Sequence, residues 1–341
     1  MFLKSRNPLK TSSGNIYNHL LDWDDVLTML LITPVFVFCF IGTTLAAEYC
    51  YDISSSCGPA NWANFSSTCD GSKQSPIDID RLRLYKNMSL GAFTVKGYDT
   101  SPNQTWRISN NGYTIVLTLS SELNVSGAGL PVTYKAAQLH FHWGNLTTNG
   151  SEHTLDSKRY SMEMHIVHIK STHANISSAL GDPEGLSVFG FFMQVSGTNN
   201  TNYDTIINAI RKIPHKGDSY NLPSTFPLES LLAPGEKYNR YYRYVGSLTT
   251  PPCNQSVIWT MFEEPINISQ TQYNFFVNNI YSTPAEVSQH DKLIENFRPI
   301  QAVNSRRVYA SKDATVLSCA SIPVLSLILS VLQLLSMKLV L

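Results

Sequence analysis

The sequence has no excess of charge of either sign, because 25 Lys and Arg side chains balance 25 Asp and Glu side chains. It also has no dense run of Lys or Arg. Both absences argue against a protein that binds nucleic acid or an anionic lipid surface. The hydrophobic content of 43% is ample for a packed core, which argues against a chain that is disordered in bulk.

Internal repeats, low-complexity linkers and abrupt changes of composition are also missing between residues 48 and 309. One domain of about 260 residues is therefore the simplest organisation of this region. The motif His-Glu-x-x-His does not occur anywhere in the sequence. Its absence argues against a zinc protease.

The amino-terminal region has the features of an export signal. An apolar stretch at residues 26–47 ends in Thr44-Leu45-Ala46-Ala47, small residues that suit a cut before Ala47 or Glu48. We expect residues 1–47 to be a signal peptide with an unusually long amino-terminal extension. Acidic residues at 22, 24 and 25 lie where a signal peptide prefers positive charge, so a signal anchor is the alternative.

A second apolar stretch covers residues 322–341. Small residues around Ala310 and Ser311, a mainly polar spacer and then this tail are the layout of a GPI-attachment signal. We expect residues 310–341 to be that signal, with attachment at Ser311 and a location on the extracellular face of the plasma membrane. A retained membrane helix is the alternative, which Pro323 and Lys338 disfavour.

Cysteine and asparagine usage also indicates export. Cys39 and Cys319 lie in the two end segments, and four cysteines remain, at positions 50, 57, 69 and 253. In an oxidising compartment four cysteines form two disulfides, with three possible connectivities. Ten Asn-x-Ser/Thr sequons predict a glycosylated surface protein, at Asn64, Asn87, Asn103, Asn124, Asn145, Asn149, Asn175, Asn199, Asn254 and Asn267.

The region between the two end segments reads as a large sheet with few helices. Short β-branched or aromatic runs predict strands at residues 113–119, 137–143, 162–169, 186–195 and 255–262. Helices are predicted at residues 203–212 and after Ser269, where Ser269 and Gln272 form a capping-box pattern. The fold class is therefore mainly β (α+β), as a single domain with short peripheral helices.

Three histidines on two of these strands carry the strongest chemical signal. His140 and His142 are two residues apart on one strand and so point to the same face. On the next strand His165 shares a face with Glu163 and Val167, and the Asn-Gly turn between the strands lets them lie in one sheet. Three imidazoles can hold Zn²⁺ and leave a fourth position for water, whose pKa falls to about 7.

Two neighbours of these histidines can orient their rings. Gln138 shares a face with His140, and Glu163 shares a face with His165, so each can fix the tautomer of the neighbouring ring. A His-x-His pattern alone often occurs without a metal. His168 faces away from His165 and reads as a structural residue, and His19, His173, His215 and His290 have no partner at ligand spacing.

Five separated strings give the chain its resemblance to a known family. They are Gln74-Ser75-Pro76-Ile77-Asp78-Ile79, His140-Phe141-His142-Trp143-Gly144, Gly150-Ser151-Glu152-His153-Thr154, Glu163-Met164-His165-Ile166-Val167-His168 and Tyr244-Val245-Gly246-Ser247-Leu248-Thr249-Thr250-Pro251-Pro252, with a weaker sixth at Gly58-Pro59-Ala60-Asn61-Trp62. Together they resemble the α-class carbonic anhydrases, in particular the membrane-anchored branch, over nearly the whole of residues 48–309. The resemblance implies a large, mostly antiparallel central sheet.

The resemblance also implies a reaction and the residues that perform it. It implies reversible hydration of carbon dioxide to bicarbonate by zinc-bound hydroxide, with His140, His142 and His165 as the zinc ligands. It implies that the Thr249 hydroxyl donates a hydrogen bond to Glu152, so that the threonine oxygen accepts one from the hydroxide and orients it. The residues implied for the carbon dioxide pocket are Val167, Val188, Leu248, Thr250 and Trp259.

Further implications of the resemblance are structural. It implies disulfides Cys50–Cys57 and Cys69–Cys253, and cis peptide bonds before Pro76 and Pro252. We expect a monomer that acts on a small molecule and is held to the membrane by its lipid anchor. The alternative function is a surface binding or adhesion module of the same fold in which catalysis is incidental.

One position departs from the family pattern. The string Ser109-Asn110-Asn111-Gly112-Tyr113 resembles a family stretch whose last residue is often histidine, the proton shuttle. A phenol with an ordinary pKa near 10 cannot relay protons at neutral pH as an imidazole does. We therefore expect Tyr113 to make the enzyme slower than its fastest relatives and sensitive to buffer. The usual Trp and Tyr of the amino end are not evident, except for Tyr51.

Overall fold

A computed structural model describes residues 48–120, 122–232 and 238–318. The expected signal peptide and the apolar carboxyl-terminal tail lie outside the described residues. Within the described residues, no helix is both long enough and apolar enough to cross a membrane.

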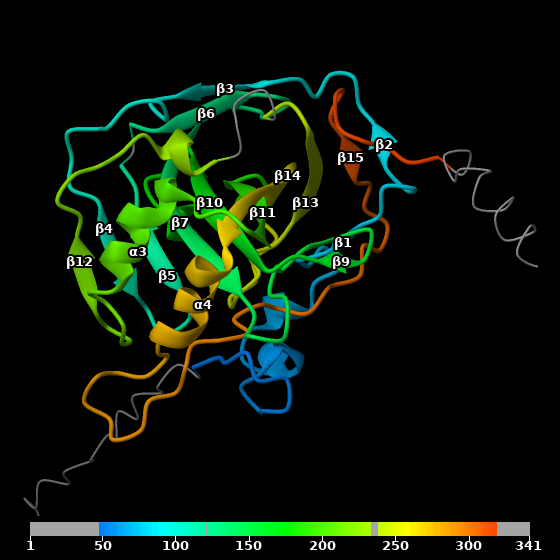
Figure 1. Cartoon of the computed structure of the whole chain (residues 1–341). Coiled ribbons are helices and arrows are strands. Elements are labelled where there is room, and N and C mark those ends of the chain that lie inside the picture. Colours follow the sequence, from blue (N-terminus) through cyan, green and yellow to red (C-terminus); the bar gives the residue numbers. More distant parts are fainter. Residues whose placement is uncertain (1–47, 121, 233–237, 319–341) are drawn as a thin grey trace, which may run out of the picture. The chain divides into compact units, whose positions relative to one another are not determined.

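Among the described residues, twelve strands form one large sheet (Figure 1). Its main path runs β12 (Ser219–Asn221), β4 (Arg107–Asn110), β5 (Ile115–Thr118), β7 (Tyr134–Trp143), β10 (Met162–Lys170), β11 (Leu186–Ser196), β14 (Val257–Ser269), β13 (Tyr241–Gly246), β15 (Tyr309–Ala310) and β2 (Tyr85–Lys86). Beside it, β3 (Phe93–Lys96) pairs with β6 (Asn124–Gly127), which also pairs with β7. Most pairs are antiparallel, and β11/β14 and β15/β2 are parallel. The expected mostly antiparallel sheet is confirmed.

The remaining elements are short. A small sheet joins β1 (Asp78–Ile79), β8 (Thr154–Leu155) and β9 (Lys158–Arg159). Within the part of the chain that the structure describes, the α-helices are α2 (Ile176–Ala179), α3 (Asp204–Ile210) and α4 (Gln270–Asn279), and four 3-10 helices cover Pro59–Asn64, Ser67–Asp70, Thr201–Tyr203 and Leu228–Leu231. Helix α4 begins with the predicted capping box, in which Ser269 accepts from the Gln272 backbone N–H and Gln272 accepts from that of Ser269.

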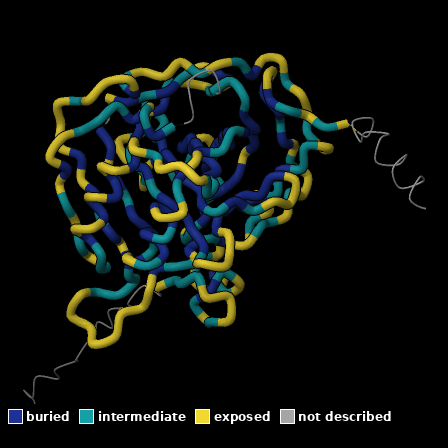
Figure 2. The backbone as a smooth tube through the Cα atoms, viewed as in Figure 1, coloured by how far each residue is buried: buried dark blue, intermediate teal, exposed yellow. Residues whose placement is uncertain are grey.

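The central strands divide the core into two faces. On β10, Met164 and Ile166 pack into one hydrophobic cluster together with residues of α3 and α4. The alternate residue Val167 packs into a second cluster with Val188 and Trp259 of β11 and β14. This alternation follows from the period of two in a strand. Figure 2 shows that burial is concentrated in these central strands and exposure in the connecting loops.

The described chain continues beyond the expected domain end at residue 309. Ala310 completes β15, and Ser311 is fully buried, with its hydroxyl donating to the Asn239 carbonyl and accepting from the Tyr241 backbone N–H. Further along, the Leu317 backbone N–H donates to the Arg81 carbonyl. The segment that was expected to begin a cleaved signal is therefore bonded to the domain up to residue 317.

Candidate metal centre

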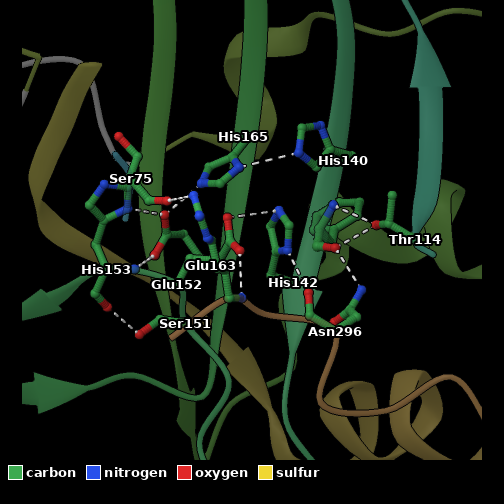
Figure 3. Close-up of polar contacts among 12 residues, drawn as sticks. Ser75, Thr114, His140, His142, Ser151, Glu152, His153, Glu163, His165 and Asn296 are labelled. Carbon is green, nitrogen blue, oxygen red and sulfur yellow. Dashed lines mark hydrogen bonds and ion pairs between the residues drawn. The ribbon is translucent and has the colours of Figure 1, made fainter. Parts of the chain in front are cut away.

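The three predicted histidines converge because of strand register. His140 on β7 lies directly opposite His165 on β10, and His142 lies opposite Glu163. The ring centroids of the three histidines are 4.7 to 5.1 Å apart. One nitrogen from each ring lies within 4.8 Å of the other two (Figure 3). The trio predicted from sequence is thus a candidate metal centre.

Hydrogen bonds to the outer nitrogen of each ring decide which nitrogen faces the centre. His140 Nδ1 lies 3.1 Å from Gln138 Oε1, and His142 Nδ1 lies 2.7 Å from the Asn296 carbonyl. His165 uses its other nitrogen, because its Nε2 lies 2.5 Å from Glu163 Oε1. The nitrogens left toward the centre are Nε2 of His140 and His142 and Nδ1 of His165. Gln138 and Glu163 thus contact the rings that they were predicted to orient, and their orienting role remains a prediction.

The geometry fits zinc. His165 Nδ1 and His140 Nε2 are 3.2 Å apart. Two ligands at the 2.0–2.1 Å typical of zinc in a tetrahedral shell would be about 3.3 Å apart. His142 Nε2 is buried and has no hydrogen-bond partner among the described residues. A buried polar atom without a partner is costly, and coordination to a metal would remove that cost.

The electrostatics also favour a metal. Burial, together with the neighbouring imidazoles, holds the pKa of His140 well below its usual value, and burial likewise lowers the pKa of His142. Both rings are therefore neutral near pH 7, which is the form that binds a metal. Burial opposes ionisation of Glu163, but its contacts with His153 and His165 outweigh burial and hold the pKa of its carboxyl below the usual range.

Behind the metal centre runs a chain of buried polar groups that sequence reasoning missed. Glu163 Oε1 is 2.7 Å from His153 Nδ1, and His153 Nε2 is 2.7 Å from the Tyr244 hydroxyl. The Tyr244 hydroxyl donates to Ser75 Oγ at 2.8 Å. His153, Tyr244 and Ser75 all lie in the strings that carry the family resemblance. Their place in those strings is the one sequence feature that could have pointed to them. The chain fixes Glu163 and, through it, the ring of His165.

Glu152 and Thr249 are both buried, but no hydrogen bond joins them. Glu152 Oε1 accepts from the Arg298 backbone N–H at 2.9 Å. Its Oε2 lies 3.4 Å from His142 Nε2 and has no hydrogen-bond partner among the described residues. The expected Thr249–Glu152 hydrogen bond is therefore not formed here, although the carboxylate oxygen that would accept it is open. Arg298 was not singled out from sequence.

The predicted substrate-pocket residues lie in a row beside the metal centre. Val167 is paired in register with Val188, and Val188 with Trp259, across three neighbouring strands. Leu248 is half-buried against the same cluster. The Trp259 ring lies 4.9 Å from the ring of His165, so this apolar surface adjoins the metal ligands. The fifth residue, Thr250, is half-buried and lies beside Tyr49.

Tyr113 lies between β4 and β5, where its ring stacks on Tyr49 with centroids 4.1 Å apart and 12° between the planes. Burial, and then a hydrogen bond to Glu48, raise the pKa of the Tyr113 phenol above its usual value. The phenol is thus even further from titrating at neutral pH. The two aromatic residues at the amino end are Tyr49 and Tyr51, of which sequence reasoning found only the second.

Other predicted features have mixed outcomes. Both disulfides, Cys50–Cys57 and Cys69–Cys253, are formed, and the peptide bonds before Pro76 and Pro252 are cis. His168 faces away from the metal centre, with Nε2 2.5 Å from the Tyr98 hydroxyl. None of the ten sequon asparagines is buried, and their glycosylation remains a prediction.

Comparisons with known proteins agree with this geometry. Residues 57–312 match the family model of eukaryotic-type carbonic anhydrase. The chain is 38% identical to carbonic anhydrase 15 of Mus musculus over 84% of this chain and 92% of that protein. It is 35% identical to carbonic anhydrase 4 of Oryctolagus cuniculus, over 82% and 89%, and 37% identical to carbonic anhydrase 12 of Homo sapiens, over 80% and 76%.

Proposed function

The chain belongs to the eukaryotic-type carbonic anhydrase family, and on that premise we propose that it hydrates carbon dioxide reversibly to bicarbonate and a proton at the outer surface of the cell. Membership makes it a zinc-dependent carbonate dehydratase. The observation that carries the proposal is the convergence of His140, His142 and His165, each with its outer nitrogen bonded and its inner nitrogen directed to one point.

His140 Nε2, His142 Nε2 and His165 Nδ1 would hold the zinc ion. Zinc bound by three imidazoles lowers the pKa of a bound water to about 7 and so supplies a hydroxide nucleophile at neutral pH. Gln138, the Asn296 carbonyl and Glu163 keep the three rings in the orientation that this requires.

Thr249 and Glu152 would orient the attacking oxygen. Glu152 Oε2, which has no hydrogen-bond partner among the described residues, would accept from the Thr249 hydroxyl during the reaction, and the Arg298 backbone N–H holds the other carboxylate oxygen in place. A threonine hydroxyl that donates to a carboxylate can only accept from the nucleophile, which aims the nucleophile's lone pair. Val167, Val188 and Trp259 offer a weakly polar gas an apolar surface next to the ligands.

Zinc content and carbon dioxide hydration of the purified protein test the reaction. We expect about one zinc per chain, and His142→Ala should lower both zinc content and hydration, because zinc then loses one of three protein ligands. His173→Ala removes a histidine that is bonded to Asp182 away from the centre and is the matched control. A wild-type protein that hydrates carbon dioxide fully without metal would disprove the proposal.

The location is the finer part of the proposal. We propose that residues 1–47 direct export and that a GPI anchor replaces the residues after Ser311. In GPI attachment the carbonyl carbon of the attachment residue changes partner, and its side chain does not react. Because Ser311 is fully buried once the domain has folded, attachment there requires that the cut precede folding of this segment, and the cut would remove the bonds of residues 312–317.

Release from intact cells by a phosphatidylinositol-specific phospholipase tests the anchor. Mass spectrometry of the carboxyl-terminal peptide should show a lipid-free anchor remnant on Ser311. Activity that stays on the cells after phospholipase treatment would favour a retained helix instead.

A further inference from the structure

Both terminal nitrogens of the Arg298 guanidinium are hydrogen-bonded, and among the described residues none of their partners is a carboxylate. The side chain is only 3% exposed. Its Nη1 donates to Gln74 Oε1 at 2.8 Å and to the Ser75 carbonyl at 3.0 Å, and its Nη2 donates to the Cys69 carbonyl at 3.1 Å. A buried cation is costly unless its donors are used, so these bonds fix the position of the side chain.

Gln74 and Ser75 connect this guanidinium to both ends of the segment that carries Thr249. The Ser75 backbone N–H donates to Ser247 Oγ at 2.9 Å, and Ser75 Oγ accepts from the Ser247 backbone N–H at 3.0 Å. Gln74 Nε2 donates to the Cys253 carbonyl at 3.3 Å. Ser247 lies two residues before Thr249, and Cys253 lies four residues after it. The segment is therefore held on both sides of Thr249.

The same arginine also holds the carboxylate that Thr249 is expected to meet. The Arg298 backbone N–H donates to Glu152 Oε1 at 2.9 Å. Arg298 thus contacts Glu152 through its backbone and reaches the Thr249 segment through its side chain. Gln74, Ser75 and Glu152 are all buried, so water does not compete with these hydrogen bonds.

We propose that the Arg298 side chain is a positioning group that sets how Thr249 lies relative to Glu152. The inference rests on the proposed function, in which the Thr249 hydroxyl donates to Glu152 during the reaction. Among the described residues Arg298 is bonded to none of the three metal ligands, so its loss should leave zinc binding intact. It should lower the rate of carbon dioxide conversion, because a misplacement of about 1 Å can cost about 100-fold.

Arg298→Lys tests the side chain, because a lysine keeps the charge but its single ammonium cannot replace the planar fork. We expect kcat/KM for carbon dioxide to fall about tenfold or more at unchanged zinc content. Arg243→Lys is the matched control. Arg243 is similarly buried, at 6% exposed, and donates to the Ala128 carbonyl and the Thr260 hydroxyl instead. A loss of stability is expected in both variants, and a loss of kcat/KM only in Arg298→Lys.

Gln74→Met tests the same path without removing the arginine, and it decides the question if Arg298→Lys does not fold. Methionine keeps the length of the side chain and loses the bonds to Arg298 and to the Cys253 carbonyl. We expect kcat/KM to fall severalfold. Because the two side chains act through one shared hydrogen bond, the double variant should lose less than the product of the two single losses.

Amide hydrogen exchange of the metal-free protein supplies a readout that does not depend on activity. Exchange at residues 247–253 should accelerate in Arg298→Lys and in Gln74→Met, and not in Arg243→Lys. The positioning role is overturned if kcat/KM is unchanged in Gln74→Met or in folded Arg298→Lys, if Arg243→Lys loses as much, or if exchange is unchanged. A wild-type protein that binds zinc without hydrating carbon dioxide would overturn the proposed function instead, so the two failures are distinguishable.

Discussion

The metal centre and a second cluster, formed by Glu48, Tyr49, Tyr113 and Lys216 and called here the tyrosine cluster, are built in different ways. In the metal centre, His140, His142 and His165 lie on two neighbouring strands, and the sheet register alone brings them together. In the tyrosine cluster, Glu48, Tyr113 and Lys216 come from loops, and side-chain contacts join them. The metal centre should therefore keep its structure under conditions that open the tyrosine cluster. The paired backbones of a sheet open cooperatively, whereas a cluster of side chains opens locally.

Among the changes that test this difference, removal of the long disulfide should have the largest effect on stability. Cys69–Cys253 joins residues 184 apart, and Cys50–Cys57 joins residues only 7 apart. Closing the longer loop stabilises more, so we expect the double variant of Cys69 and Cys253 to serine to lose about 2–5 kcal/mol of unfolding free energy. Urea unfolding measures the loss, and hydration should fall too because Cys253 follows the Thr249 segment.

The same substitutions at Cys50 and Cys57 are the control for the long bridge. They should cost less stability and should loosen the packing of Tyr49 on Tyr113 without changing zinc content. An equal loss of unfolding free energy in both double variants would show that loop length does not decide the difference.

Glu163→Gln tests how much the metal centre depends on a side chain that orients one of its ligands. The glutamine keeps the shape of the side chain but loses the charge that faces His165 and His153. Zinc affinity should fall by about 10–100-fold, as for other residues that orient metal ligands. Zinc transfer to a chelator measures it, with the exposed Glu184→Gln as the matched control. Unchanged zinc affinity would show that backbone register alone orients the ring.

His168 tests the opposite face of β10, away from both regions. It is fully buried, and burial lowers its pKa to about 4. Because the unfolded chain binds this proton near pH 6.5, the native state is favoured above that pH and loses stability as the pH falls toward 4. The loss from this one residue should reach about 2 kcal/mol at pH 5.

Unfolding free energies at pH 7.5 and pH 5, for the wild type and for His168→Gln, isolate that contribution. The pH-dependent loss should be about 2 kcal/mol smaller in the variant. If both proteins lose the same amount between these pH values, His168 is not the group responsible.

The smallest expected effect is at Tyr113 in the tyrosine cluster. Tyr113→His places an imidazole, which exchanges protons near neutral pH, where a phenol of raised pKa now lies. We expect hydration turnover at low buffer concentration to rise severalfold, which is less than a fully positioned general acid or base contributes, and the gain to vanish at high buffer. Tyr113→Phe removes the hydroxyl without adding a proton acceptor and should give no gain. A turnover that does not rise in Tyr113→His would indicate another proton route.

Much of the fold was predictable because its determinants are local. The alternation of residues in β7 and β10 predicted that His140, His142 and His165 lie on one face. The capping-box pattern of Ser269 and Gln272 predicted the start of α4. The predicted strand at residues 113–119 is shorter in the structure, as β5 covers only Ile115–Thr118, because Tyr113 belongs to the preceding turn. The disulfide pairing came from family resemblance and not from spacing.

Residue types and their short spacings thus determined the sheet, the three metal ligands and their orienting neighbours Gln138 and Glu163. Only the tertiary structure decided that Asn296 bonds His142 from 154 positions away, that Arg298 rather than Thr249 holds Glu152, and that Tyr49 stacks on Tyr113. The physical reason is the distance along the chain between the residues that interact. A strand repeats every two residues and so can be read along the chain, whereas contacts between loops depend on how the whole sheet brings the loops together.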